Sequence, residues 1–159
     1  MKKLIFSVLL LITMSSYAQT SLSAGAGWNT DHYSVLQAGV MHNFRHFNLQ
    51  AGVYTPFSDS KSKETLWHVQ VGKEFCLNRY LSILPAVGYG HTSNDYIDHS
   101  SFVASTYLYA DITRRLDVFG GFIYAGRPSY GIFSGGLRYS FGNDRYDDEE
   151  HYKRKYRNW

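Results

Sequence analysis

The stretch Trp67-His68-Val69-Gln70-Val71-Gly72-Lys73-Glu74-Phe75 alternates between two kinds of side chain at nearly every step. Its odd-numbered positions are aromatic or aliphatic apart from Lys73, and its even-numbered positions are polar or glycine. A period of two places successive side chains on opposite faces of a β-strand. The stretch therefore predicts a strand with one apolar and one polar face.

The same alternation recurs on both sides of this stretch and divides the chain into eight segments. We expect strands at residues 20–29, 33–44, 46–57, 65–77, 79–92, 101–113, 115–126 and 130–141. The connections at 30–32, 58–64, 93–100 and 127–129 include two long polar ones, whereas those around Arg45, Asn78 and Arg114 are short. Short turns at one end and longer loops at the other are typical of outer-membrane barrels. The sequence thus predicts an all-β fold, an eight-stranded antiparallel up-and-down transmembrane β-barrel over residues 19–142.

The composition of the two faces predicts which one points outward. The polar face is rich in Gly, Ser, Gln and Asn, which are small enough to fill a narrow eight-stranded cylinder. The apolar face carries its largest rings near the strand ends, as expected for two membrane interfaces. The rings expected near the loop end are Trp28, Phe57, Trp67, Tyr89, Phe102, Tyr124 and Phe133, and those near the turn end are Phe44, Phe47, Phe75, Tyr139 and Phe141. The alternative is a soluble barrel, in which Leu49, Val69 and Ile83 would converge on the interior.

One residue interrupts this pattern of strands. Pro85 lies in the middle of the strand expected at 79–92, where a closed barrel has no edge to tolerate a missing N–H donor. We therefore expect a β-bulge at Pro85.

The two ends of the chain do not belong to the expected barrel. Lys2 and Lys3 precede a short apolar run, and the small residue Ala18 closes the segment, so residues 1–18 are predicted to be a secretory signal peptide. After it no stretch approaches the ~18 apolar residues of a membrane-spanning helix. Residues 143–159 form a charged tail with five acidic and five basic residues between 144 and 157, expected in the periplasm.

Charge and cysteine content exclude several classes of function. Without Lys2 and Lys3 the chain has 14 basic and 13 acidic residues, which argues against a nucleic-acid binder. Cys76 is the single cysteine, so no internal disulfide can form. His91 and His99 flank a loop containing Asp95 and Asp98, but nothing fixes a ligand geometry there. We predict neither a metal site nor a cofactor.

The last expected strand ends in Ser-Gly-Gly-Leu-Arg-Tyr-Ser-Phe, residues 134–141. Its Ser134, Gly136, Tyr139 and Phe141 resemble the assembly signal of outer-membrane barrels, and the chain to Phe141 resembles small eight-stranded barrels of the OmpA/OmpX type. The signal peptide resembles those of exported proteins of Bacteroidota. The resemblance implies export to the outer membrane of a Gram-negative bacterium and contact with the barrel-assembly machinery, outer-membrane lipids and lipopolysaccharide. The signal normally closes the chain, whereas eighteen residues follow it here.

Four charged residues fall on the predicted inward face: Glu74, Asp111, Asp117 and Arg138. Buried charges need partners, so we expect Arg138 to pair with Glu74 or Asp111 across the lumen. Such a cluster resembles the interior charge networks of OmpA-like barrels. We expect a packed polar plug, with a gate as the alternative.

The most enzyme-like segment is His91-Thr92-Ser93-Asn94. A histidine that contacts a serine hydroxyl can activate it for acyl transfer. The segment resembles the active segment of outer-membrane lipid A deacylases, which implies His91 as base and Ser93 as nucleophile. Asp95 or Asp98 would have to supply the acid. The plainer interpretation is a rim histidine at the start of a polar loop.

Three functions therefore remain from the sequence. The first is a structural or surface-interaction role without a wide pore and without enzymatic activity, in which the loops at 58–64 and 93–100 meet an extracellular ligand. The second is lipid A modification by His91 and Ser93. The third is a narrow conduit for small solutes, which requires a continuous lumen past Arg138.

Overall fold

The computed structural model describes residues 19–44, 46–57, 64–93, 98–113, 115–126 and 129–141. The predicted signal peptide, the charged tail and the central parts of the two long loops, residues 58–63 and 94–97, lie outside these ranges. In the part of the chain that the structure describes, no helix is long and apolar enough to cross a membrane.

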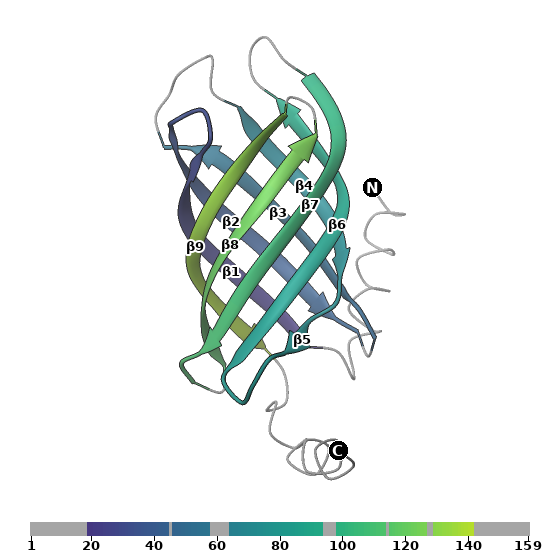
Figure 1. Ribbon diagram of the computed structural model, residues 1–159, viewed down its shortest axis with the longest axis vertical. Coiled ribbons are helices and arrows are strands. Elements are labelled where there is room, and N and C mark those ends of the chain that lie inside the picture. Colours follow the sequence, from purple (N-terminus) through teal and green to yellow (C-terminus); the bar gives the residue numbers. More distant parts are fainter. Residues whose placement is uncertain are drawn as a thin grey trace, which may run out of the picture.

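The described chain is a closed barrel of tilted antiparallel strands (Figure 1). Its strands are β1 (Gln19–Asn29), β2 (Ser34–Asn43), β3 (Asn48–Pro56), β4 (Thr65–Gly72), β5 (Phe75–Cys76), β6 (Leu81–Ser93), β7 (Asp98–Asp111), β8 (Leu116–Gly126) and β9 (Ser129–Phe141). Apart from β4 and β5, neighbours in sequence pair with one another, β1 pairs with β9, and β4 pairs with β6 to complete the cylinder. β4 and β5 are two parts of one barrel strand, because both pair with β6 in one register. The predicted eight-stranded up-and-down barrel is therefore confirmed.

The interruption between β4 and β5 has its cause in Pro85. Gly72 pairs with Ala86 and Phe75 pairs with Ile83, so no residue is inserted between them. The Pro85 carbonyl accepts a hydrogen bond from the Lys73 N–H at 3.3 Å, but proline has no N–H to return to Lys73. The expected bulge is therefore wrong: the register continues past Pro85, and the ladder loses a hydrogen bond instead.

The barrel turns its apolar face outward, as the sequence predicts. In β4 the side chain of Val69 is 52% exposed, whereas that of Gln70 is 1% exposed. Gln50 on β3 is also buried. The soluble-barrel alternative required the reverse and is wrong.

The interior departs from the sequence prediction in one respect, because it is not filled by polar side chains and glycine alone. Near the loop end, an apolar cluster occupies it: Val35, Tyr54, Leu66, Val103, Ile123, Ala125, Tyr130 and Ile132. A second cluster lies nearer the turn end and comprises Met41, Leu84, Tyr107, Tyr109 and Phe119. A cylinder this narrow is closed by its own side chains, and large apolar groups fill it as well as polar ones do.

Candidate functional site

The described residues contain two clusters of polar and charged side chains that are candidates for function. The first, the interior cluster of Glu74, Asp117 and Arg138, lies inside the barrel at the turn end. The second, the rim cluster of His91, Asp98 and Ser100, lies outside the barrel at the loop end. The strands of the same barrel position both clusters. The interior cluster is enclosed by the barrel wall, whereas the rim cluster lies on its outer surface.

Register places the interior cluster. Asp117 on β8 is directly opposite Arg138 on β9, and the Arg138 Nε donates to the Asp117 Oδ2 at 2.6 Å. Glu74, between β4 and β5, reaches Arg138 across the lumen and accepts from Nη2 at 3.2 Å and from Nη1 at 3.3 Å. The Arg138 guanidinium also lies 3.6 Å from the centre of the Tyr109 ring. Arg138 is 1% exposed, so its charge is balanced almost entirely by protein groups.

The structure brings together three of the four charged residues predicted inside the barrel. Glu74 contacts Arg138, as the sequence suggested. Asp117 provides the second carboxylate, and Asp111 lies opposite Asp117 in the pairing of β7 with β8. The Tyr109 ring is a partner that sequence reasoning missed, although its place two residues before Asp111 put it on the inward face.

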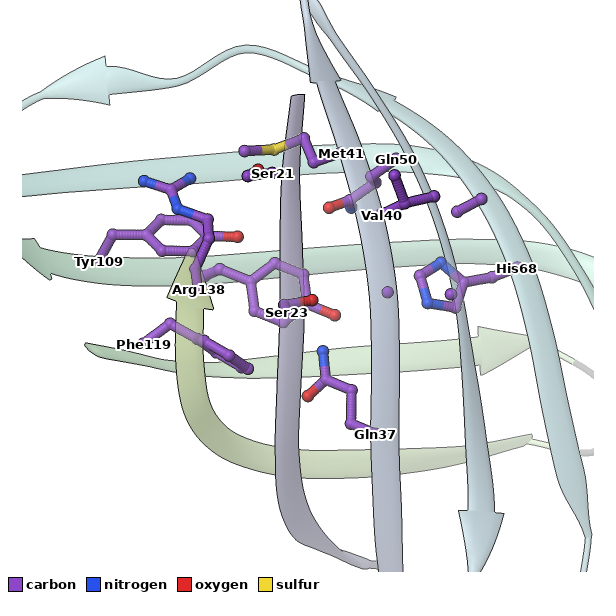
Figure 2. Close-up of a pocket in the computed structure, with 14 residues that line it drawn as sticks. Ser21, Ser23, Gln37, Val40, Met41, Gln50, His68, Tyr109, Phe119 and Arg138 are labelled. Carbon is purple, nitrogen blue, oxygen red and sulfur yellow. The ribbon is translucent and has the colours of Figure 1, made fainter. Parts of the chain in front are cut away.

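Polar side chains fill the middle of the barrel next to this cluster. The Gln50 amide donates to the Gln70 carbonyl oxygen at 2.8 Å, and the Ser105 hydroxyl donates to the same oxygen at 3.0 Å. The Tyr54 and Tyr107 hydroxyls are 2.6 Å apart. Figure 2 shows the small cavity beside these layers, with Arg138 and Tyr109 at one side and His68 at the other. Its volume of about 20 Å³ holds about one water molecule.

The rim cluster lies on the hairpin of β6 and β7. His91 Nδ1 is 3.1 Å from the Ser100 hydroxyl, and His91 Nε2 is 3.1 Å from Asp98 Oδ1. Ser100 is directly opposite His91 in the register, and Asp98 lies two residues from Ser100 on the same face. In the described residues the serine that contacts His91 is thus Ser100, whereas Ser93 lies opposite Asp98. Ser93, the nucleophile that the sequence resemblance implied, therefore does not lie where His91 could accept its proton.

The inner side of the loop end carries a separate polar group. The Asn29 amide donates to the Tyr33 hydroxyl at 2.7 Å, and the Glu64 backbone N–H donates to the same oxygen at 3.4 Å. Burial raises the pKa of Tyr33, and burial together with the nearby Asp31 raises the pKa of Glu64. No group of three or more His, Cys, Asp or Glu side chains within the described ranges could hold a metal ion.

The outer surface carries aromatic side chains at both ends of its apolar band. Eleven of the twelve predicted interface rings are exposed: Trp28, Phe57, Trp67, Tyr89, Phe102, Tyr124 and Phe133 near the loop end, and Phe47, Phe75, Tyr139 and Phe141 near the turn end. Phe44 is half-buried and stacks on Phe47 with the ring centres 4.6 Å apart.

The four residues of the predicted assembly signal lie on β9 and divide between its two faces. Ser134 and Gly136 point inward, and Tyr139 and Phe141 point outward with their ring centres 4.9 Å apart. A Cβ atom on Gly136 would lie 2.1 Å from the Ala24 carbonyl oxygen. The close approach of β1 to β9 therefore accounts for the glycine in structural terms.

No protein-family model and no curated protein matches the chain. Solved structures match its fold. A de novo designed transmembrane β-barrel has 15% sequence identity and a TM-score of 0.61, with 77% of this chain and 95% of that chain covered. Ail, the attachment invasion locus protein of Yersinia pestis, has 14% identity and a TM-score of 0.58, with 78% and 99% covered.

A third match is the N-terminal β-barrel domain of Pseudomonas aeruginosa OprF, at 10% identity and a TM-score of 0.58, with 78% of this chain and 97% of that chain covered. At these identities the likeness concerns the fold. The chain has the fold of small eight-stranded outer-membrane β-barrels.

Proposed function

We propose that this chain is an integral outer-membrane protein of a Gram-negative bacterium with a structural or surface-interaction role. The observation that carries the proposal is the exposed apolar band with a belt of aromatic side chains at each end. Such a surface is costly in water, and the two belts match the two interfaces of a membrane. The outer-membrane protein Ail, which shares the fold, supports the same location.

In this proposal the signal peptide at 1–18 directs export, and the barrel-assembly machinery inserts the chain through the signal on β9. Outer-membrane lipids and lipopolysaccharide then surround the apolar band. The loops at 58–64 and 93–100 face the outside and meet an extracellular ligand, whereas the tail at 143–159 stays in the periplasm. The similarity of the signal peptide to those of Bacteroidota supports that group as the source.

Gel migration of the membrane fraction tests the barrel. An intact outer-membrane barrel migrates differently in SDS before and after boiling, so we expect two positions for the wild-type chain. An epitope inserted between residues 94 and 97 tests orientation. We expect antibody to reach it on intact cells, whereas the same epitope after Trp159 is reached only after permeabilisation. Equal migration with and without boiling, or the opposite pattern of accessibility, contradicts the proposal.

The interior argues against the narrow-conduit alternative. Arg138 is buried between Glu74 and Asp117, and the side chains of two apolar clusters fill the interior nearer the loop end and nearer the turn end. We expect no conductance steps from the purified chain in planar bilayers.

A further inference from the structure

The rim cluster has the contacts of an acyl-transfer site. A serine nucleophile needs a histidine within hydrogen-bond distance, and that histidine needs a third group at its other nitrogen. Ser100, His91 and Asp98 meet both requirements, each contact being 3.1 Å. Asp98 at Nε2 favours the neutral tautomer that carries its proton there, which leaves Nδ1 free to accept the Ser100 proton.

The cluster also lies at the depth where lipid esters are found. His91 is two residues beyond Tyr89 on β6, and Ser100 is two residues before Phe102 on β7, both toward the loop end. Tyr89 and Phe102 belong to the exposed ring that marks the outer interface. All three side chains of the cluster lie on the lipid-facing side of the wall, where an outer-leaflet lipid has direct access.

An apolar groove of about 520 Å³ on the outer surface leads to the cluster. Its floor follows rows of paired residues across the wall, and one row runs from Ala38 through Val53 and Trp67 to His91. The groove spans β1 to β6, about four strand spacings or roughly 19 Å, which is similar to the ~15 Å hydrocarbon thickness of one leaflet. Because the row rises toward the loop end as it approaches β6, an acyl chain lying in it would bring its ester to His91.

We propose that the rim cluster hydrolyses an acyl ester of an outer-leaflet lipid whose chain lies in this groove. The Ser100 Oγ attacks the ester carbonyl carbon while its proton passes to His91 Nδ1. The lipid alcohol leaves with that proton, and the acyl group remains as an ester on Ser100. Water then gives a proton to His91 and attacks this ester, which releases the fatty acid and restores the Ser100 hydroxyl. Ser100 and His91 are catalytic residues, and Asp98 is a positioning residue.

This inference rests on the proposed outer-membrane location, and the test separates the two. The full chain is refolded into vesicles of diacyl phosphatidylethanolamine, and into the same vesicles with an added acylated glucosamine glycolipid. Heat-modifiable migration first shows that each variant forms the barrel. Fatty acid release is then measured by mass spectrometry. Release from the first vesicles identifies a phospholipid as substrate, and release only from the second identifies the glycolipid.

Matched serine variants test the assignment of the nucleophile. We expect Ser100→Ala and His91→Asn to lower the rate on the order of 100-fold or more, and Ser93→Ala to retain it. A fluorophosphonate is expected to label the wild-type chain at Ser100. Absence of fatty acid release by a folded wild-type barrel from both vesicles overturns the proposal, as does full activity of Ser100→Ala.

A groove variant tests the acyl site independently of the chemistry. Ala38→Trp fills the groove from an exposed position without touching the rim cluster. We expect it to raise KM for the long-chain lipid and to leave kcat unchanged, because binding is weakened equally in the ground and transition states. An unchanged KM rules out this groove as the acyl site.

Discussion

The two sides of the barrel wall are built from alternate residues of the same strands, yet they obey different requirements. On the inside, Arg138 has two carboxylates and a ring around it. On the outside, Leu137 lies next to it in sequence and is half exposed. An inward group needs space and a specific partner, whereas an outward group needs only to be apolar between the interfaces. Substitutions on the inside are therefore expected to destabilise the barrel when they change the size of a side chain or remove its partner. Those on the outside are expected to destabilise it when they introduce a polar or charged group.

The largest expected effect is the loss of Arg138. Arg138→Met removes the buried cation that Glu74 and Asp117 contact, which costs about 3–5 kcal/mol. Urea unfolding in lipid vesicles, followed by heat-modifiable migration, measures the change in free energy.

A triple variant provides the matched control for this prediction. Adding Glu74→Gln and Asp117→Asn to Arg138→Met removes the charges together, and we expect it to recover most of the lost stability. A triple variant as unstable as Arg138→Met alone would show that packing, and not charge pairing, holds this cluster together.

A charge on the outside gives the next largest effect. On the outer surface of β9, Leu137 lies between Phe133, an aromatic residue near the loop end, and Tyr139, one near the turn end. Leu137 therefore faces the middle of the apolar band. Leu137→Arg is expected to cost about 2–4 kcal/mol in a bilayer. Leu137→Phe serves as control and should be nearly neutral. The same unfolding assay measures both, and an arginine tolerated as well as the phenylalanine contradicts a lipid-facing wall.

Substitutions at two glycines test how crowded the inward and outward sides of the wall are. A Cβ on inward Gly136 would lie 2.1 Å from the Ala24 carbonyl oxygen, whereas one on outward Gly120 meets nothing within 4 Å. We expect Gly136→Ala to cost about 1–3 kcal/mol and Gly120→Ala to be close to neutral. Equal stabilities would mean that β1 and β9 separate more easily than the structure indicates.

The smallest effect is expected at the rim cluster. His91 and Ser100 are accessible to solvent and lie on the outer side of the wall, so His91→Asn and Ser100→Ala should change stability by less than about 0.5 kcal/mol. Their predicted loss of hydrolysis would then be a loss of chemistry in an intact barrel. A large destabilisation by either variant would instead assign this cluster a structural role.

The sequence predicts the outside of the barrel better than the inside. The period of two assigns Val69 and Leu137 to lipid without any knowledge of their neighbours. The inward apolar residues Leu66, Val103 and Ile132 converge from distant strands, and their common cluster depends on the stagger between strands, which no local pattern reveals.

The candidate sites divide in the same way. The parity of Glu74, Asp117 and Arg138 was predictable, but the contact of Arg138 with Asp117 follows from the register of β8 with β9. Ser100 was missed because the strand was expected to begin at residue 101, whereas β7 begins at Asp98 and brings Ser100 opposite His91.

The proline in β6 has a consequence for how the cylinder opens. The pairing of β6 with β4 and β5 closes the wall. Pro85 lies at this boundary, and because it has no N–H, one hydrogen bond of the ladder is missing there. Local opening of a folded protein begins where the fewest hydrogen bonds must break. In a hydrogen–deuterium exchange experiment, Lys73 and its neighbours along this seam should therefore acquire deuterium before the amides between β1 and β9.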